Sequence, residues 1–206
     1  MIELYTWTTP NGFKPLIMLE ETGLPHRVHP VNLRKGEQKA PEFLRINPNA
    51  KIPALVDPEG EGGEVRVFES GAMLIYLAEK TGQFLPSSGQ ARAEVLSWLM
   101  FQMGGVGPMM GQLAHFRDAK REDAYPLERY SNEVLRLAKV LDDRLAVVPF
   151  MAGDYSIADM ATFPWVRRLS ALGVDTAPYP HIARWVAAQE ERPAVKRALA
   201  WKPSLT

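Results

Sequence analysis

Hydrophobic and polar residues in the N-terminal part of the chain alternate between strand-like and helix-like spacing. Ile2–Trp7 alternates with period two and predicts a short strand, and the apolar spacing that follows predicts a helix ending near Gly23. His26–Val31 predicts a second strand. We expect this strand at the edge of a sheet, because Pro30 has no amide hydrogen to donate to a neighbouring strand.

The pattern then changes to a polar loop over residues 34–39 and a short helix over Pro41–Arg45. Ile52–Asp57 and Glu64–Phe68 predict two strands, and the loop between them is short enough for an antiparallel hairpin. Ser70 opens a helix with an apolar face. The order βαβ, short helix, ββα predicts an α/β domain.

Helical spacing dominates the rest of the chain, and no convincing strand follows the linker-like composition of residues 83–89. Gly104–Pro108 should loosen or kink the first of these helices. We therefore expect an α/β domain over residues 1–82 and an all-helical domain over residues 90–206. The helices are predicted over Gln90–Phe116, Glu122–Val147, a segment beginning near Ser156, His181–Glu191 and Ala194–Trp201.

The composition is that of a folded protein whose charges balance. Of the 206 residues, 46% are hydrophobic and 23% are charged, which is typical of globular chains. The 24 basic and 24 acidic side chains cancel, so no overall field attracts nucleic acid or an anionic membrane surface. We expect neither as a partner.

Cysteine is absent from the chain, which excludes disulfides, thiolate metal sites and a cysteine nucleophile carried by the protein. His26 and His29 are separated by an odd number of positions in a predicted strand, so they face opposite sides. No metal site is therefore predicted.

The N-terminal segment lacks the basic and apolar regions of a signal peptide. No apolar run approaches the roughly 18 residues of a membrane span. We therefore expect a cytoplasmic protein.

Lys51–Val56 is the first of three segments suited to binding a ligand. Pro53 begins a strand where it removes one amide donor. A cis bond between Ile52 and Pro53 would leave the backbone groups of Ile52 for an extended peptide. The alternative is a proline that only starts the strand, and cis bonds are a minority of about 5–6% before proline.

Glu69 and Ser70 form the second segment. A serine at a helix start satisfies an amide, and a helix N-terminus attracts carboxylates. An amino-acid ligand would use both residues, with its carboxylate on Ser70 and its ammonium on Glu69. Considered alone, the segment is better explained as a simple N-cap.

Thr9–Gly12 is the third segment, and it lies between the first strand and the first helix, where α/β folds present ligands. Hydroxyl and amide donors aimed at a sulfur favour the thiolate, because hydrogen bonds to the charged form lower its pKa. A capped turn explains the segment equally well.

Together the three segments resemble the glutathione site of the glutathione transferase family, and the resemblance covers nearly the whole chain. The shared features are Ile52-Pro53-Ala54-Leu55, Glu69-Ser70 and the order of the predicted elements. The resemblance implies a thioredoxin-like N-terminal domain with a cis bond before Pro53. It also implies that the backbone of Ile52 holds the cysteinyl unit of glutathione, and that Glu69 and Ser70 hold its γ-glutamyl end.

Finer motifs are similar to those of the Nu class, the bacterial disulfide-bond oxidoreductases. They are Thr9-Pro10-Asn11-Gly12, Gly36-Glu37-Gln38, Asn47–Pro53 and Gly104–Met109. This resemblance implies that Thr9 and Asn11 face the glutathione sulfur, and that Gln38 and Lys51 lie along the bound peptide, with Gln38 at its glycyl end. It implies that Arg129 reaches the site of a neighbouring subunit in a homodimer.

The activity implied by the resemblance is glutathione-dependent reduction of a small-molecule disulfide by the thiolate of bound glutathione. Conjugation of glutathione to an electrophile and reduction of a hydroperoxide start from the same thiolate and remain alternatives. A non-enzymatic scaffold with the same fold is a third interpretation. It is disfavoured because such proteins commonly lose the residues that hold glutathione, whereas Pro53, Glu69 and Ser70 are present here.

Features of the helical half are interpreted as structural. Ser156 and Asp159 have capping-box spacing, with aspartate in place of the usual glutamate or glutamine, so Asp159 is assigned to folding and not to catalysis. Trp98 is expected in the core. The apolar residues that follow it up to Met110 either pack or line a pocket for a second substrate.

Overall fold

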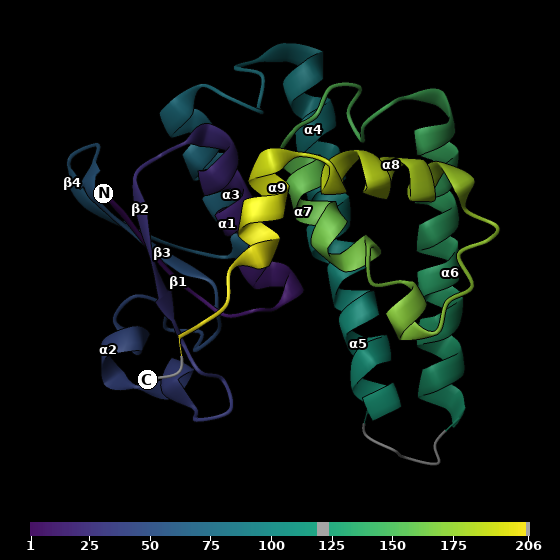
Figure 1. The fold of residues 1–206 in the computed structure, drawn as a ribbon, viewed down its shortest axis with the longest axis horizontal. Helices are drawn as coiled ribbons and strands as arrows, with labels where there is room; N and C mark the ends of the chain where they lie inside the picture. Colours follow the sequence, from purple (N-terminus) through teal and green to yellow (C-terminus); the bar gives the residue numbers. More distant parts are fainter. Residues whose placement is uncertain (119–123, 205–206) are drawn as a thin grey trace. The chain divides into compact units, whose positions relative to one another are not determined.

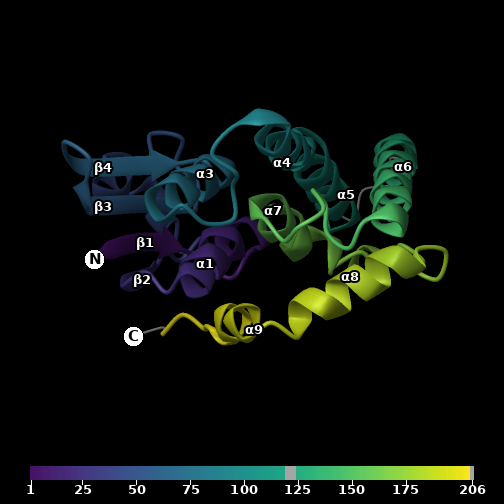
Figure 2. The same ribbon diagram turned by 90° about the horizontal axis from the view of Figure 1, so that it is seen from above.

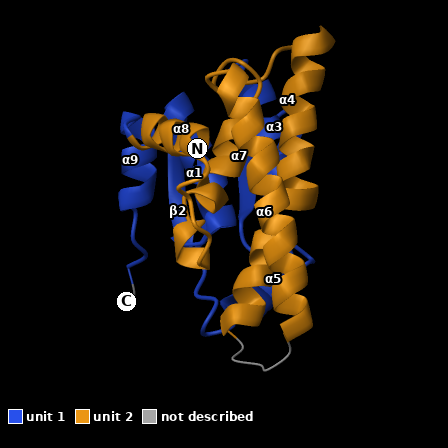
Figure 3. Ribbon diagram, turned by 90° about the vertical axis from the view of Figure 1, so that its right-hand side faces the viewer, with its two compact units in different colours: residues 1–83, 191–206 blue, residues 84–190 orange. Residues whose placement is uncertain are grey.

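A computed structural model describes residues 1–118 and 124–204, which form two compact units (Figure 3). Unit 1 contains residues 1–83 and the chain from Glu191 onward, and unit 2 contains Phe84–Glu190. The sequence placed the last helix in the helical domain, but its contacts group it with the N-terminal residues. The predicted limits of 1–82 and 90–206, with a linker at 83–89, stay a prediction.

A four-stranded sheet organises unit 1, in the order β2-β1-β3-β4 (Figure 1). The strands are β1 (Ile2–Thr6), β2 (His26–Pro30), β3 (Ala54–Gly60) and β4 (Gly63–Phe68). β1 pairs with β2 in parallel and with β3 antiparallel, and β3 and β4 form an antiparallel hairpin. The edge position predicted for β2 from Pro30 is confirmed.

The hairpin differs from the sequence prediction, which left residues 58–63 as a loop. β3 continues to Gly60 and β4 begins at Gly63, with a register shift between Asp57 and Gly60. Gly62 and Gly63 have φ values of 82° and 122°, which glycine adopts without steric cost. The turn between β3 and β4 is therefore tight, and both strands extend further than their hydrophobic pattern indicates.

Helices α1 (Pro10–Thr22) and α3 (Ser70–Thr81) lie next to each other on one side of the sheet (Figure 2). α1 buries a continuous apolar run from Leu16 to Leu19 against this layer. A 3₁₀ helix, η1 (Glu37–Lys39), and the short helix α2 (Pro41–Leu44) follow β2. The sequence predicted α2 but left η1 as a loop.

α9 (Pro193–Ala200) lies beside α1 in unit 1. Arg192 donates to both carboxylate oxygens of Glu21, at 2.6 and 2.9 Å, and Arg197 pairs with Glu20 at 2.6 Å. These contacts between distant parts of the sequence explain why α9 belongs to unit 1.

Unit 2 is helical, with α7 at its centre, and its described residues form isolated bridges between Phe150 and Asp154 but no longer strand. Its helices are α4 (Gly89–Phe101), the π-helical segment η2 (Gln102–Val106), α5 (Gly107–Asp118), α6 (Ala124–Val147), α7 (Ile157–Val166), the 3₁₀ helix η3 (Ser170–Leu172) and α8 (Pro180–Glu190). The predicted start of α6 at Glu122 lies outside the described residues. Within residues 1–118 and 124–204, no helix has both the length and the apolar character needed to cross a bilayer.

The interruption predicted at Gly104–Pro108 is confirmed as a widened helical turn. The Gly107 amide bonds to Gln102 O, five residues back. Pro108 has no amide hydrogen for the helical ladder, and two glycines give the preceding turn little side-chain packing. The helix therefore continues through a π segment and does not end.

Ser156 caps α7, and the capping box that the sequence predicted with Asp159 is confirmed. Asp159 is fully buried and accepts hydrogen bonds inside the core of unit 2. The prediction that Trp98 belongs to the core is wrong, because Trp98 is only half-buried. Val95 and Leu99 carry the buried face of α4, and Arg144 covers the Trp98 ring at 5.5 Å from its centroid.

Candidate functional site

The three candidate segments come together where strands of the sheet begin and end. This side of the sheet, formed by strand ends and not by an outer strand, is called the sheet edge below. β1 ends there at Thr6, β3 begins there at Ala54 and β4 ends there at Phe68. The register confirms the alignment, since Ala54 pairs with Tyr5 on one side and with Phe68 on the other. The residues that follow β1 and β4 and precede β3 are therefore neighbours.

Thr9 is the N-cap of α1. Its Oγ1 accepts a hydrogen bond from the Gly12 amide at 3.1 Å. A threonine hydroxyl has one proton to donate besides the lone pairs with which it accepts, so capping leaves Thr9 able to donate to a ligand. Asn11 lies in the first turn of α1 and, like Thr9, is half-buried.

Gly12 lets the start of α1 approach the end of β1. A Cβ atom at this position would overlap Trp7 O and Thr6 Oγ1. Thr6 Oγ1 in turn donates to Gly12 O at 3.1 Å. The absence of a side chain therefore fixes the distance between the strand and the loop that carries Thr9 and Asn11.

The peptide bond between Ile52 and Pro53 is cis. Pro53 is buried, Ile52 is half-buried and Lys51 is exposed. The side-chain amide of Asn47 donates to Lys51 O at 2.6 Å and holds the approach to the bond. The cis geometry implied by the resemblance is confirmed, and Ile52 lies just before β3, near the end of β1.

Glu69 and Ser70 join β4 to α3 in an unusual conformation. Glu69 is the N-cap residue of α3, with φ 71° and ψ 117°, and its side chain makes no capping hydrogen bond within the described part of the chain. Such a backbone conformation costs a residue other than glycine about 1–3 kcal/mol. Ser70 is the first residue of the helix and not its cap, so the simple capping interpretation of the serine is wrong.

Lys14 is the residue at this edge that sequence reasoning missed. Its side chain is 1% exposed, and its Nζ donates to Ser70 Oγ at 3.3 Å. Burial lowers the pKa of Lys14 to about 7, and the Glu69 carboxylate acts in the opposite direction. The available signal was a lysine inside the apolar run from Phe13 to Leu19, where a surface helix would carry a hydrophobic residue.

Gln38 lies on η1, in the segment that follows β2. Because β2 is parallel to β1, its C-terminal end reaches the same edge of the sheet. The Oε1 atom of Gln38 is buried and has no hydrogen-bond partner among the described residues. Its contact with a ligand stays a prediction.

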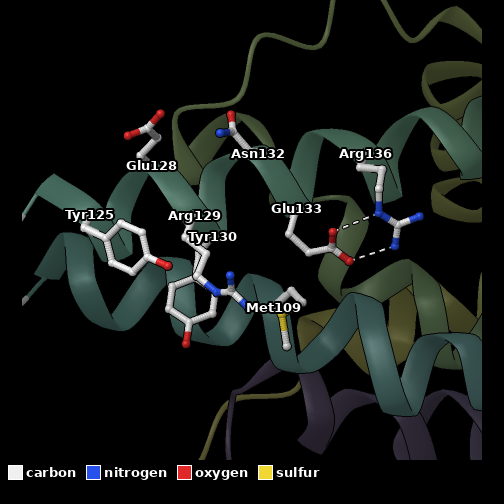
Figure 4. Close-up of a pocket in the computed structure, with 8 residues that line it drawn as sticks. All are labelled: Met109, Tyr125, Glu128, Arg129, Tyr130, Asn132, Glu133 and Arg136. Atoms are coloured by element: carbon white, nitrogen blue, oxygen red, sulfur yellow. Dashed lines mark hydrogen bonds and ion pairs between the residues drawn. The ribbon is translucent and has the colours of Figure 1, made fainter.

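Arg129 lies on α6 of unit 2, at an open hollow of about 780 Å³. Figure 4 shows Arg129 and Tyr130 beside Met109 of α5, with the ion pair between Glu133 and Arg136 further along α6. The other lining residues are Tyr125, Glu128 and Asn132. Arg129 is exposed, and its predicted contact with a neighbouring subunit stays a prediction.

Carboxylates and histidines do not form a metal site in residues 1–118 and 124–204, where no group of three or more such side chains is suitably arranged. The sheet edge has instead the chemistry of a site for an amino acid or a peptide. Glu69 supplies a carboxylate, Ser70 and the start of α3 supply donors, and the Ile52 backbone lies between them and Thr9.

The sheet order, the cis proline before β3 and the helix-starting serine define a thioredoxin-like domain followed by a helical unit. Residues 8–80 match the family model described as glutathione S-transferase, N-terminal domain, and residues 112–188 match that of the C-terminal domain. The chain belongs to the glutathione S-transferase family.

Relatives of known name support the same assignment. The chain is 49% identical over 203 residues to the disulfide-bond oxidoreductase YfcG of Escherichia coli, covering 97% of this chain and 94% of the relative. A glutathione transferase family member of Pseudomonas fluorescens, solved with two glutathione molecules bound, has a TM-score of 0.92 at 48% identity, covering 96% of this chain and 92% of the other. A glutathione transferase of Pseudomonas putida, solved with one glutathione disulfide per subunit, has a TM-score of 0.93 at 45% identity, covering 97% and 90%.

Proposed function

We propose that this protein is a glutathione-dependent disulfide-bond reductase that uses the thiolate of bound glutathione as its nucleophile. The observation that carries the proposal is the convergence of Thr9, the Ile52–Pro53 bond and Ser70 at one edge of the sheet. The name of the Escherichia coli relative and the glutathione species in the two Pseudomonas structures support the same reaction class.

Each part of glutathione has a complementary group in this proposal. The γ-glutamyl carboxylate accepts from Ser70 and from the start of α3, and the adjacent ammonium pairs with Glu69. The cysteinyl backbone pairs with Ile52 beside Pro53. The glycyl end extends toward Gln38 and Lys51.

The sulfur of glutathione lies near Thr9 and Asn11 in this arrangement. Hydrogen bonds from these side chains stabilise the thiolate more than the thiol, so they lower the thiol pKa and raise the reactive fraction at neutral pH. The donor geometry at Thr9 fits this role, since capping through Gly12 uses a lone pair of the hydroxyl and not its proton.

The reaction proceeds by two thiol–disulfide exchanges. The glutathione thiolate attacks one sulfur of the substrate disulfide, the S–S bond breaks, and the other half leaves as a thiolate that takes up a proton. A second glutathione thiolate attacks the mixed disulfide at the glutathione sulfur and releases the second substrate thiol. Two electrons pass to the substrate, and glutathione disulfide forms. The chain has no cysteine, so every sulfur atom in the reaction belongs to glutathione or the substrate.

A homodimer in which Arg129 reaches the glutathione site of the neighbouring subunit is part of the proposal. Arg129 is exposed at an open hollow on α6, which supports such a role. Sedimentation velocity should give the mass of a dimer, and Arg129→Ala should raise the KM for glutathione. A monomeric enzyme of full activity would contradict this part of the proposal.

The decisive assay compares glutathione-dependent reduction of hydroxyethyl disulfide with conjugation of glutathione to chlorodinitrobenzene. We expect strong reduction and weak conjugation. Thr9→Ala and Asn11→Ala should each lower the reduction rate about ten- to a hundredfold, the effect of one lost hydrogen bond to a charged group. Thr9→Ser keeps both the cap and the hydroxyl and is the matched control.

Conjugation with negligible reduction would move the activity to a general transferase, and rapid turnover of cumene hydroperoxide would move it to a peroxidase. No binding of glutathione or its disulfide in calorimetry would leave a non-enzymatic scaffold. Each of these three results would refute the proposed reductase.

A further inference from the structure

Lys14 is a cation placed inside unit 1. Its side chain is 1% exposed, on a helix whose next five residues, Pro15–Leu19, are all buried. Removing a charge from water is costly unless the charge is paired and hydrogen-bonded, and an apolar residue of similar length would avoid that cost. A buried lysine that only filled space would therefore be a poor solution, so its polar contacts bear on its role.

One of these contacts is with Ser70, at the N-terminus of α3. Lys14 Nζ lies 3.3 Å from Ser70 Oγ, and an ammonium group can only donate. The serine oxygen therefore accepts from Lys14, and the serine proton must point in another direction. A charged Lys14 makes Ser70 a donor, the polarity that a carboxylate requires.

Electrostatics favours an anion at the same place. The N-terminus of α3 carries a partial positive charge, and Lys14 brings a full positive charge to the same serine. Both positive centres attract a negative group placed beside this hydroxyl. The Glu69 carboxylate attracts Lys14, but its side chain is exposed and is the proposed partner of the ligand ammonium.

Charged groups on α9 and β1, which pack against α1, have partners away from Lys14. α9 brings Arg192 and Arg197, which pair with Glu21 and Glu20 at the far end of α1. β1 brings Glu3, which pairs with His29 of β2. α3 begins beside Glu69, whose carboxylate acts on Lys14.

We propose that Lys14 is a positioning residue for the γ-glutamyl carboxylate of glutathione, an inference that rests on the proposed function. It holds the Ser70 hydroxyl from the interior of the unit with the serine proton directed to the ligand, and its charge adds to that of the α3 N-terminus. Lys14 acts on the ligand through Ser70 and is not itself a catalytic residue.

Replacement of Lys14 by methionine tests this role, with Lys196→Met as the matched control on the exposed surface of α9. The ligand is S-hexylglutathione, which has no thiol to titrate. Calorimetry at pH 6.5 should show a Kd raised about ten- to a hundredfold for Lys14→Met and unchanged for Lys196→Met. In the disulfide assay the KM for glutathione should rise while kcat at saturation changes little.

A double-mutant cycle separates action through Ser70 from a general effect on the fold. If Lys14 acts through the serine hydroxyl, Lys14→Met should have little further effect on the Kd once Ser70 is alanine. A glutathione analogue in which 4-aminobutyrate replaces the γ-glutamyl residue lacks the carboxylate but keeps the other groups. The wild type and Lys14→Met should bind this analogue equally.

The wild-type protein provides a test without a substitution. Burial lowers the pKa of Lys14 to about 7, and a bound carboxylate favours the charged form, so S-hexylglutathione binding should take up a proton near pH 7.5. Calorimetry in buffers of different ionisation enthalpy measures this uptake. Affinity should fall between pH 7 and pH 8.5 in the wild type and stay flat in Lys14→Met.

Equal Kd values for the wild type and Lys14→Met, additive effects in the cycle, or no proton uptake by the wild type would each overturn the inference and leave the proposed function standing. Failure of the wild type to bind glutathione or S-hexylglutathione at all would overturn the proposed function, and the inference with it. A Lys14→Met variant that does not fold leaves the decision to the proton-uptake measurement.

Discussion

Replacing Asp159 with alanine should remove a large part of the stability of the helical unit, because one buried carboxylate serves several donors. Its Oδ1 accepts from the Met151 amide at 2.9 Å and from Trp185 Nε1 at 2.8 Å. Its Oδ2 accepts from the Ser156 amide at 3.0 Å and the Ser156 hydroxyl at 3.2 Å. Asp159 thereby joins α7, α8 and the segment between α6 and α7.

The size of the effect follows from the donors that lose their acceptor. The alanine variant leaves three N–H groups, from Met151, Ser156 and Trp185, without an acceptor in a fully buried place. Each buried unsatisfied donor costs about 1–3 kcal/mol. Water entering the cavity and the loss of a buried charge offset part of this, so we expect the free energy of unfolding to fall by about 4 kcal/mol.

Asparagine at the same position should have a smaller effect. Its carbonyl oxygen can take the place of Oδ1 for Met151 and Trp185, while its amide would face the Ser156 amide, donor against donor. One lost acceptor corresponds to about 1–3 kcal/mol. The order of stability should therefore be wild type, Asp159→Asn, Asp159→Ala.

Urea unfolding followed by tryptophan fluorescence and far-ultraviolet circular dichroism measures this order. Asp154→Ala is the matched control, since Asp154 is an exposed aspartate in the same segment. An Asp159→Ala variant within 1 kcal/mol of the wild type would refute the reasoning. Equal losses for alanine and asparagine would show that the charge, and not the number of acceptors, stabilises the network.

Three further outcomes are expected. Lys14→Met should raise the free energy of unfolding below pH 7, by an amount that declines as the pH rises toward 10.5. The reason is that burial lowers the native pKa of Lys14 from 10.5 to about 7, so the unfolded wild type binds more protons than the native state between these pH values. Urea unfolding at several pH values measures the trend. Glu69→Gly should stabilise the protein by about 1 kcal/mol by relieving the positive φ, yet weaken glutathione binding, and equal affinity in calorimetry would contradict the role of Glu69. Gly12→Ala should destabilise the protein by about 1–3 kcal/mol, because its methyl group overlaps Trp7 O and Thr6 Oγ1, and an unchanged melting temperature would contradict this.

Local signals made most of the element order predictable. The period-two pattern of β1, the proline at the end of β2 and the capping box at Ser156 each act within a few residues, so the sequence alone specified them. The cis bond before Pro53 was different, because base rates disfavour it and only the resemblance to a family implied it. Local sequence patterns therefore did not predict the backbone geometry of the candidate site.

Contacts between distant residues account for what the sequence did not predict. Arg192 and Glu21 are 171 positions apart, so their pairing, and with it the place of α9 in unit 1, has no local pattern. Lys14 and Ser70 are 56 positions apart. The conformation of Glu69 also depends on how β4 meets α3, and glutamate itself gives no signal for a positive φ. The sequence identified Glu69 and Ser70 as candidates, but it could not show that Ser70 follows the cap.

Two residues near the start of α3, Glu69 and Lys14, lower the stability of the fold, and their position indicates why they are there. Glu69 holds a conformation that glycine would adopt more easily, and Lys14 holds a charge where a methionine would pack without desolvation. A single substitution at each position would remove the unfavourable backbone conformation and the buried charge. In the proposed site each residue instead serves one of the opposite charges of an amino-acid end group, Glu69 the ammonium and Lys14, through Ser70, the carboxylate. If that is why they are retained, Glu69→Gly and Lys14→Met must both stabilise the fold and weaken the ligand. A site residue and a packing residue are distinguished by this opposition of sign, because loss of a packing residue lowers stability and affinity together.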